Sequence, residues 1–333
     1  MRERATRRHD IIHQKNVPMQ TRDGLTLYAD VVRPTTPGRY PVLLSRNPYG
    51  KDTAMENIDG AAFQFARAGY VSVVQDCRGR FTSDGEYYPL VNEVSDGYDA
   101  VEWAARLSGS NGRVGTFGQS YLGASQYMIA CGNSMPPSLG AMAPVSGASD
   151  YHEGWVYHTG GAMLWGWAVP YAIHKGRNTL ERMGRQDLLS KMDKYVEEGT
   201  NFSMPLRQEW YRHLPIKDWG ELLKEAAPYF ADYIRHSDDG DYWWGINLRR
   251  HLESVRVPML HISSWYDIFL EGALNAFQGI KEHSAFQQAR RGQHMVIGPW
   301  GHIFPYVRPT SRGTGDIDFG PEALVDLQER QLR

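Results

Sequence analysis

Residues Val114 to Gly123 read VGTFGQSYLG, and this stretch decides the fold. The short apolar run VGTF is typical of a buried strand, and we expect residues 121–130 to form a helix. Between them, Gly118-Gln119-Ser120 predicts a tight strand-to-helix turn that holds the serine in a strained backbone conformation. Because such a turn presents its serine at the end of a strand, Ser120 is a candidate nucleophile.

The match to the usual elbow motif, Gly-x-Ser-x-Gly, is incomplete. The motif needs small neighbours so that the turn can close, but Leu122 occupies the second glycine position and Gly123 follows one residue later. The alternative is a serine that merely begins a helix. The strand and helix on either side favour the elbow, whose helix N-terminus would point at the site, so the N–H of Tyr121 is expected to form half of an oxyanion hole.

The sequence on both sides of the elbow alternates between strand and helix patterns. Tyr70 to Gln75 (YVSVVQ) is an unbroken apolar run, the mark of a strand that is covered on both faces. We expect further strands at 25–32, 41–45, 139–145, 258–262 and 294–297, and helices at 54–68, 96–107 and 269–282. The alternation predicts an α/β-hydrolase fold, a mostly parallel, doubly wound sheet with helices on both faces.

Residues 149–250 differ from the rest because they lack short β-branched runs. One helix is expected after Thr179 as its N-cap and another after Asp218. The start of the region is crowded with aromatic side chains, namely Trp155, Tyr157, Trp165 and Trp167. We interpret the region as a helical cap inserted over the sheet edge, so the expected domains are 1–148 (core, first part), 149–250 (cap) and 251–333 (core, second part).

A serine hydroxyl is a weak nucleophile unless a base takes its proton. In α/β-hydrolases the nucleophile is followed along the chain by an acid and then a histidine. Asp267 follows the 258–262 strand and His302 follows the 294–297 strand, and active-site residues of open α/β sheets lie beyond such strand ends. We therefore predict Ser120, Asp267 and His302 as nucleophile, acid and base. Weaker candidates are the histidines of the cap and of the strand patterns, His152, His158, His261 and His294.

Composition excludes several other functions. The formal net charge is −2 and no basic stripe extends beyond the first residues, which argues against a nucleic-acid partner. No apolar run approaches the ~18 residues of a membrane span, and the N-terminus MRERATRRHDIIHQKN lacks the apolar region of a secretory signal. We expect a soluble cytoplasmic protein in which Cys77 and Cys131 are buried free thiols. Without an HExxH, a CxxC or a phosphate-binding glycine loop, no metal and no cofactor is expected.

The chain resembles the cocaine-esterase and Xaa-Pro dipeptidyl-peptidase family of serine hydrolases. The similarity runs in order from about Val17 to Pro305 through TRDGLTLYADVVRP, RNPYGK, GYVSVVQDCRGRFTSDGEY, DGYDAVEWAA, NGRVGTFGQSYLG, SSWYDIF and GPWGH. The family's elbow is Gly-x-Ser-Tyr-x-Gly, which accommodates Leu122. The resemblance assigns the same three catalytic residues, implies that Tyr49 of RNPY donates its hydroxyl to the oxyanion, and implies that Trp155, Trp167 and Phe269 lie near the acyl pocket.

One departure from the family concerns the C-terminus. Members usually continue into a β-sandwich of jelly-roll type, whereas this sequence of 333 residues ends in ALVDLQERQLR, which reads as the start of a helix. Both a fragment and a naturally short member remain open. The resemblance implies an exposed apolar surface where the sandwich would dock.

Three functions follow from these observations. The first is hydrolysis of a small carboxylic ester through an acyl-enzyme intermediate. The second is cleavage of Xaa-Pro peptides or α-amino esters, which needs buried carboxylates for the substrate ammonium, with Glu153 and Glu209 of the cap as candidates. The third is an inactive fragment or binding module. A homo-oligomer remains open.

Overall fold

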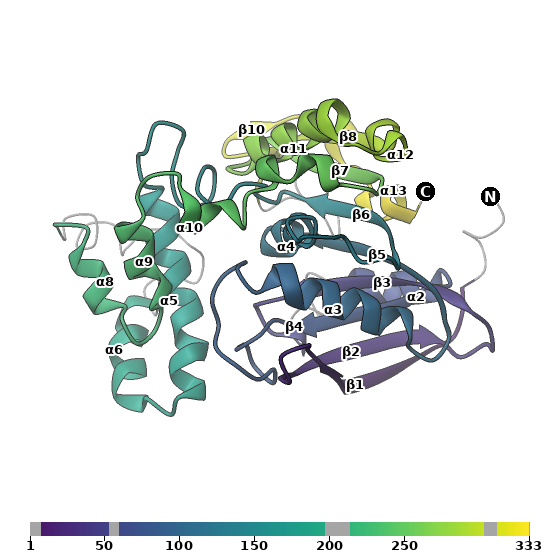
Figure 1. Cartoon of the computed structure of the whole chain (residues 1–333), viewed down its shortest axis with the longest axis horizontal. Helices are drawn as coiled ribbons and strands as arrows, with labels where there is room; N and C mark the ends of the chain where they lie inside the picture. The colour runs from purple at the N-terminus through teal and green to yellow at the C-terminus, as the bar shows by residue number, and fades with distance from the viewer. Residues whose placement is uncertain (1–7, 53–59, 197–213, 303–311, 333) are drawn as a thin grey trace.

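An eight-stranded sheet forms the centre of the structure, a computed structural model that describes residues 8–52, 60–196, 214–302 and 312–332 (Figure 1). The strand order is β1-β2-β4-β3-β5-β6-β7-β8. β2 is antiparallel to β1 and β4, and the strands from β4 to β8 pair in parallel. The strands span Ile11–Gln20, Thr26–Pro34, Tyr40–Asn47, Val71–Asp76, Ser110–Gln119, Leu139–Val145, Met259–Tyr266 and Gln293–Gly301. The predicted mostly parallel sheet is confirmed.

Helices cover both faces of this sheet because the central strands are apolar on both sides. β4 is buried along its whole length, as its unbroken apolar run predicts. On one face Phe65 of α2 packs on Val74 and Phe117, and Leu327 of α13 packs on Trp300. The helices α3, α4 and α11 contact the sheet through the main hydrophobic core. These helices span Gly60–Arg67 (α2), Glu93–Ala105 (α3), Tyr121–Ile129 (α4), Leu270–His283 (α11) and Leu327–Leu332 (α13).

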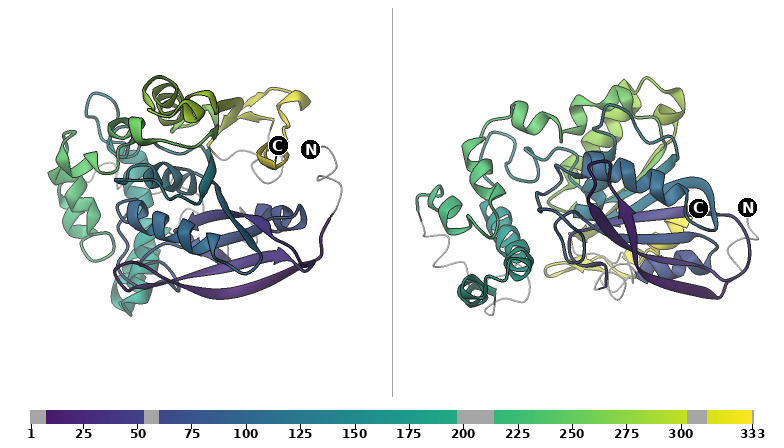
Figure 2. Two further views of the ribbon diagram at one scale, coloured as in Figure 1. Left: turned by 45° about the vertical axis from the view of Figure 1, so that its right-hand side comes forward. Right: turned by 60° about the horizontal axis from the view of Figure 1, so that its bottom comes forward.

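A group of helices stands between β6 and β7 in the chain and lies to one side of the sheet (Figure 1). The right-hand view of Figure 2 also shows these helices beside the strands. The helices are α5 (Trp165–Arg182), α6 (Gln186–Val196), α8 (Asp218–Leu222), α9 (Tyr229–Arg235) and α10 (Asp241–Trp244). β4 points its carboxyl end at this group, so the helices face the edge at which the parallel strands end (Figure 1).

The prediction of a helix capped by Thr179 is wrong. Thr179 lies inside α5, and the break comes later, at Gly184 with φ of 68°. Burial of apolar side chains outweighed the preference of threonine for an N-cap. The helix α5 buries Val169, Ile173 and Leu180 along one side and therefore begins before Thr179. The helix predicted to follow Asp218, which is α8, begins one residue earlier. Asp218 is its first residue and Lys217 is its N-cap.

Short elements complete the described chain. α12 (Gln287–Arg291) links α11 to β8, and a two-stranded ribbon of β9 (Gly313–Thr314) and β10 (Ile317–Asp318) follows β8. Three 3-10 turns span Leu248–Arg250 (η2), Leu252–Ser254 (η3) and Pro321–Ala323 (η4). None of the described helices is long and apolar enough to cross a membrane. Cys77 and Cys131 are free and buried, and burial raises the pKa of both thiols.

An apolar surface is exposed next to the end of β7. Trp265 is 62% exposed, and Tyr266 and Ile268 are about half exposed. The ring of Tyr266 contacts that of Phe319, which is itself exposed. The segment that carries these side chains also carries Asp267.

Candidate active site

Ser120 occupies a sharp turn between β5 and α4. Its backbone has φ of 63° and ψ of −122°, a conformation that L-residues rarely adopt and that costs about 1–3 kcal/mol. β5 ends at Gln119 and α4 begins at Tyr121, so the serine is the single residue between strand and helix. The strand–turn–helix arrangement read from VGTFGQSYLG is present.

Two glycines allow this turn to close. Gly118 has φ of +139°, and a Cβ there would lie 2.4 Å from the Cβ of Leu122. A Cβ at Gly123 would lie 2.5 Å from the carbonyl oxygen of Val145, at the end of β6. The small residue is thus needed at position 123, where α4 crosses β6, and not at position 122. This contact explains why the incomplete sequence motif still forms an elbow.

The structure brings the three predicted residues together. Nε2 of His302 lies 2.9 Å from Oγ of Ser120, and Nδ1 lies 3.0 Å from Oδ2 of Asp267. Asp267 is 7% exposed, and its carboxylate also accepts the N–H of Phe269 at 2.7 Å. With a proton on Nδ1, His302 donates to Asp267 and its Nε2 accepts the serine hydroxyl proton.

Strand pairing sets this geometry. Tyr266 and Gly301, the last residues of β7 and β8, are partners in the parallel ladder. Asp267 and His302 are the next residues along each strand, so they leave the sheet side by side. Gln119 adds a tether, because its Nε2 donates to the backbone carbonyl of His302 at 2.6 Å. Gln119 was not predicted as a site residue, because its only signal in the sequence is its place next to the serine.

Tyr49 follows the end of β3 and reaches the serine. Burial raises the pKa of Tyr49 to about 12, while hydrogen bonds with the side chains of Ser120 and Tyr171 and from the N–H of Tyr121 lower it. The phenol oxygen is therefore next to both the serine and the backbone N–H at the start of α4. The two donors predicted for an oxyanion hole, Tyr49 Oη–H and Tyr121 N–H, converge beside Ser120.

Three aromatic side chains that the family resemblance names gather around the histidine. Trp155 stacks on Phe269 with ring centroids 5.0 Å apart and contacts the ring of Trp167 at 5.6 Å. The His302 ring lies 5.1 Å from Phe269 and 6.1 Å from Trp167. The aromatic cluster comes from the cap and from the start of α11, so it borders the site on the cap side.

The other predicted candidates lie elsewhere. His261 is buried between Tyr127 and Gln293. The Nε2–H of His152 donates to the backbone carbonyl of Ser237, away from Ser120. His158 and His294 are exposed. Glu153 pairs with Arg249 at 3.2 Å, and Glu209 lies outside the described residues. Among the residues with described positions, no three His, Cys, Asp or Glu side chains are grouped to hold a metal ion.

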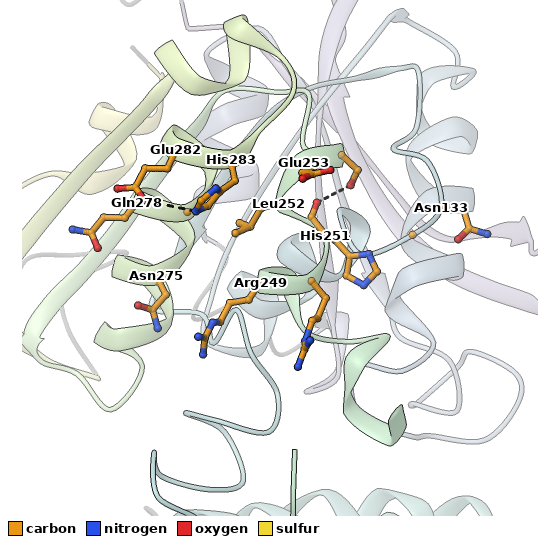
Figure 3. Close-up of a pocket in the computed structure, with 13 residues that line it drawn as sticks. Asn133, Arg249, His251, Leu252, Glu253, Asn275, Gln278, Glu282 and His283 are labelled. Carbon is orange, nitrogen blue, oxygen red and sulfur yellow. Dashed lines mark hydrogen bonds and ion pairs between the residues drawn. The ribbon is translucent and has the colours of Figure 1, made fainter. Parts of the chain in front are cut away.

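A surface hollow of about 810 Å³ lies away from the serine, between the 3-10 turns and α11 (Figure 3). None of the predicted site residues lines it. Its charges are mostly engaged, since Arg249 pairs with Glu153, Arg250 with Asp239, and His283 lies 3.7 Å from Glu282. The hollow and the serine site are therefore separate features.

Known proteins resemble this chain over most of its length. The family model for X-Pro dipeptidyl-peptidase (S15 family) matches residues 23–304. "Cocaine esterase" of a Rhodococcus species is 31% identical over 325 residues, which cover 94% of this chain and 52% of that protein. The chain thus spans about half the length of the curated relatives it matches.

Solved structures share the fold. An α-amino acid ester hydrolase superposes with a TM-score of 0.68 at 21% identity, covering 91% of this chain and 50% of that one. An aminopeptidase from a marine sediment archaeon, a Thaumarchaeota archaeon, superposes with a TM-score of 0.67 at 20% identity, covering 92% of this chain and 51% of that one. Together with the sheet order, these structures identify an α/β-hydrolase fold.

Proposed function

Because the chain belongs to the X-Pro dipeptidyl-peptidase (S15) family, we propose that it is a serine hydrolase that cleaves small carboxylic esters through an acyl-enzyme intermediate. The observation that carries the proposal is the unbroken hydrogen-bonded chain from Ser120 Oγ through His302 to Asp267. Such a chain lets an imidazole remove the proton of a serine hydroxyl while a carboxylate holds the ring in place.

The reaction divides into two similar halves. Ser120 Oγ attacks the ester carbonyl while His302 Nε2 takes its proton, and the Tyr49 hydroxyl and the Tyr121 N–H donate to the oxyanion that forms. His302 then gives the proton to the leaving alcohol, which leaves an acyl ester on Ser120. A water molecule, deprotonated by His302, attacks this ester and releases the acid and the free serine.

The proposed acyl pocket is the aromatic cluster of Trp155, Trp167 and Phe269. Its support is the contact of Trp167 and Phe269 with the His302 ring, which places apolar surface next to the reacting serine. Apolar ring surface beside the serine suits an acyl group without charge.

We also propose that the chain is organised as core 1–148, cap 149–250 and core 251–333. The support is that β1 to β6 precede the cap helices and β7 and β8 follow them, while all eight strands share one sheet. The cap supplies Trp155 and Trp167, whereas both core parts supply the serine, acid and base.

Cleavage of Xaa-Pro peptides or α-amino esters is the alternative within the family. It requires carboxylates that receive a free ammonium. Lys175 instead lies over the Tyr49 ring, and Arg80 donates to the carbonyl of Pro48. Both cations would repel an ammonium. Parallel assays of phenyl acetate and Gly-Pro-anilide decide between the two, and turnover of the anilide alone would reverse this ranking.

The direct test of the proposal is Ser120→Ala. The variant is expected to lose phenyl acetate hydrolysis by about 10⁴-fold or more, because the oxyanion donors alone cannot supply a nucleophile. Thr116→Ala, in the same strand, is the control. A fluorophosphonate probe should label the native protein and not the variant. A folded native protein that resists labelling would support a binding module instead.

A further inference from the structure

A lysine side chain is buried directly over the ring of Tyr49. Lys175 lies on α5, one helical turn after Tyr171, and is 1% exposed. Its Nζ is 3.7 Å from the centroid of the Tyr49 ring and 5.6 Å from that of Tyr171. The ammonium thus meets the face of the phenol whose oxygen hydrogen-bonds Ser120.

No carboxylate balances this cation in the part of the chain that the structure describes. Lys175 forms no ion pair there, and the other charged group beside it is Arg80, a second cation that is also 1% exposed. The guanidinium of Arg80 donates to the carbonyl oxygens of Pro48 and Lys175, both at 2.9 Å. One side chain therefore ties the backbone before Tyr49 to the backbone of Lys175.

Burial without a counter-charge is unfavourable for stability. An ammonium removed from water loses its hydration, and the face of an aromatic ring restores only part of that loss. A side chain that packs without charge, such as methionine, would fill the same space at lower free energy. The fold itself therefore gives no reason for a lysine at this position.

We propose that Lys175 is a positioning residue of the oxyanion hole, which holds a positive charge against the Tyr49 ring and so makes its hydroxyl a stronger donor to the oxyanion. The inference rests on the proposed serine hydrolase function. A cation on the ring face draws electron density from the phenol oxygen, and its field also favours negative charge on the nearby substrate oxygen. Both effects grow as the oxyanion develops and are small in the ground state.

Activity is expected to depend on the charge of Lys175 and to fall as the pH rises through the lowered pKa of its ammonium. Burial and then the charge of Arg80 lower the pKa of Lys175 well below the ordinary lysine value. The groups that face it are Tyr49, Tyr171, Arg80, His174 and Cys77. Among these, Tyr49 has its pKa raised to about 12 and His174 has its pKa lowered to about 3.

The test compares Lys175→Met, which removes the charge, with Lys175→Arg, which keeps it. With phenyl acetate we expect Lys175→Met to lower kcat by ~10-fold or more with little change in KM, and Lys175→Arg to retain most activity. Lys191→Met, an exposed lysine of α6, is the matched control. The loss of activity that follows deprotonation of Lys175 should be absent or move to higher pH in Lys175→Arg, because arginine stays charged.

Tyr49→Phe identifies the route of the effect. If Lys175 acts through the phenol hydroxyl, Lys175→Met in the Tyr49→Phe background lowers kcat far less than in the native background. Additive losses would overturn the inference, as would a loss confined to substrates that carry a carboxylate. A Lys175→Met protein with native kcat would overturn it while leaving the proposed function intact. A native protein that neither hydrolyses esters nor reacts with the fluorophosphonate would overturn both.

Discussion

Two buried lysines, Lys51 and Lys175, lie near the segment that follows β3, and their surroundings differ. Lys51, which follows β3, is 1% exposed, and its Nζ lies 3.2 Å from Oδ2 of Asp76 and donates to Oγ1 of Thr82 at 2.9 Å. Lys175 is equally buried and faces aromatic rings. The first cation is neutralised by a carboxylate from the adjacent strand, whereas the second has no such partner among the described residues.

The difference separates two uses of buried charge. The Lys51 pair joins the end of β3 to the end of β4, and Asp76 also accepts the backbone N–H of Lys51 at 2.7 Å, so the pair fixes the segment that carries Tyr49. Arg46 is also buried and paired with a carboxylate, since its Nε lies 2.5 Å from Oε2 of Glu93. The paired cations Lys51 and Arg46 stabilise the fold. The unpaired cation Lys175 lies beside Tyr49, whose hydroxyl is proposed to contact the developing oxyanion.

The largest expected effect comes from breaking the balanced pair. Asp76→Ala leaves Lys51 buried without a partner and should lower the free energy of unfolding by about 3–5 kcal/mol. Denaturant titration measures the loss. The control is Asp52→Ala, which removes the exposed partner of Lys15 and should change stability by less than about 1 kcal/mol. Equal losses of stability in the two variants would show that the buried pair of Lys51 and Asp76 contributes no more than an exposed ion pair.

His261 is a third buried basic group, and it differs from both lysines because it is neutral in the folded protein at neutral pH. Burial lowers the pKa of His261 to about 4, although its bond with Gln293 raises it. Between about pH 6.5 and 4 the unfolded chain binds a proton at this residue and the folded chain does not, so stability falls as the pH falls, by about 3 kcal/mol in all.

The measurement is the slope of unfolding free energy against pH. His261→Gln should flatten that slope between pH 6.5 and 4, whatever its effect on stability at neutral pH. His294→Gln, an exposed histidine of β8, is the control and should leave the slope unchanged. A native slope in His261→Gln would mean that other groups govern the acid range.

Replacing both members of the balanced pair should cost less than removing one. Lys51→Met combined with Asp76→Leu leaves no buried charge, and its main loss is the acceptor for the Lys51 backbone N–H. We expect a loss of about 1–3 kcal/mol relative to the native protein, smaller than that of Asp76→Ala alone. A double variant less stable than Asp76→Ala would show that packing, and not charge balance, dominates this site.

The smallest change in stability is expected at the unbalanced lysine. Lys175→Met should leave the free energy of unfolding unchanged or raise it by about 1 kcal/mol, because it removes a desolvated charge. Thermal unfolding of this variant beside Lys191→Met measures the difference. A marked loss of stability in Lys175→Met would assign Lys175 to the scaffold, together with Lys51.

Local sequence signals predicted much of this architecture. Unbroken apolar runs located β3 to β8 to within a few residues, because strands covered on both faces leave little freedom in composition. β1 was missed because its residues are mostly exposed. Its burial alternates, but the alternation is interrupted near Asn16, which has φ of 53° and lies where the pairing with β2 shifts. The cap helices were misplaced where burial against distant residues outweighed Thr179.

The candidate site divides in a similar way. Ser120, Asp267 and His302 could be proposed because each follows a recognisable strand, whereas Tyr49 and the three aromatic residues came from the family resemblance. Arg80, Lys175 and Gln119 carry no local pattern. The positions of Arg80 and Lys175 beside the segment of Tyr49 depend on how the cap and the loop after β4 meet, which spacing along the chain does not reveal.

The ladder between β7 and β8 makes the length of those strands as important as their composition. Side chains alternate between the faces of a strand, so deleting one residue of β8 upstream of Gly301 would turn the imidazole of His302 to the opposite side of the sheet. Every amino acid of the site would then still be encoded, and the hydrogen bond between His302 and Ser120 could not form. Insertions and deletions in this strand are therefore expected to be less tolerated than any single exchange of its side chains.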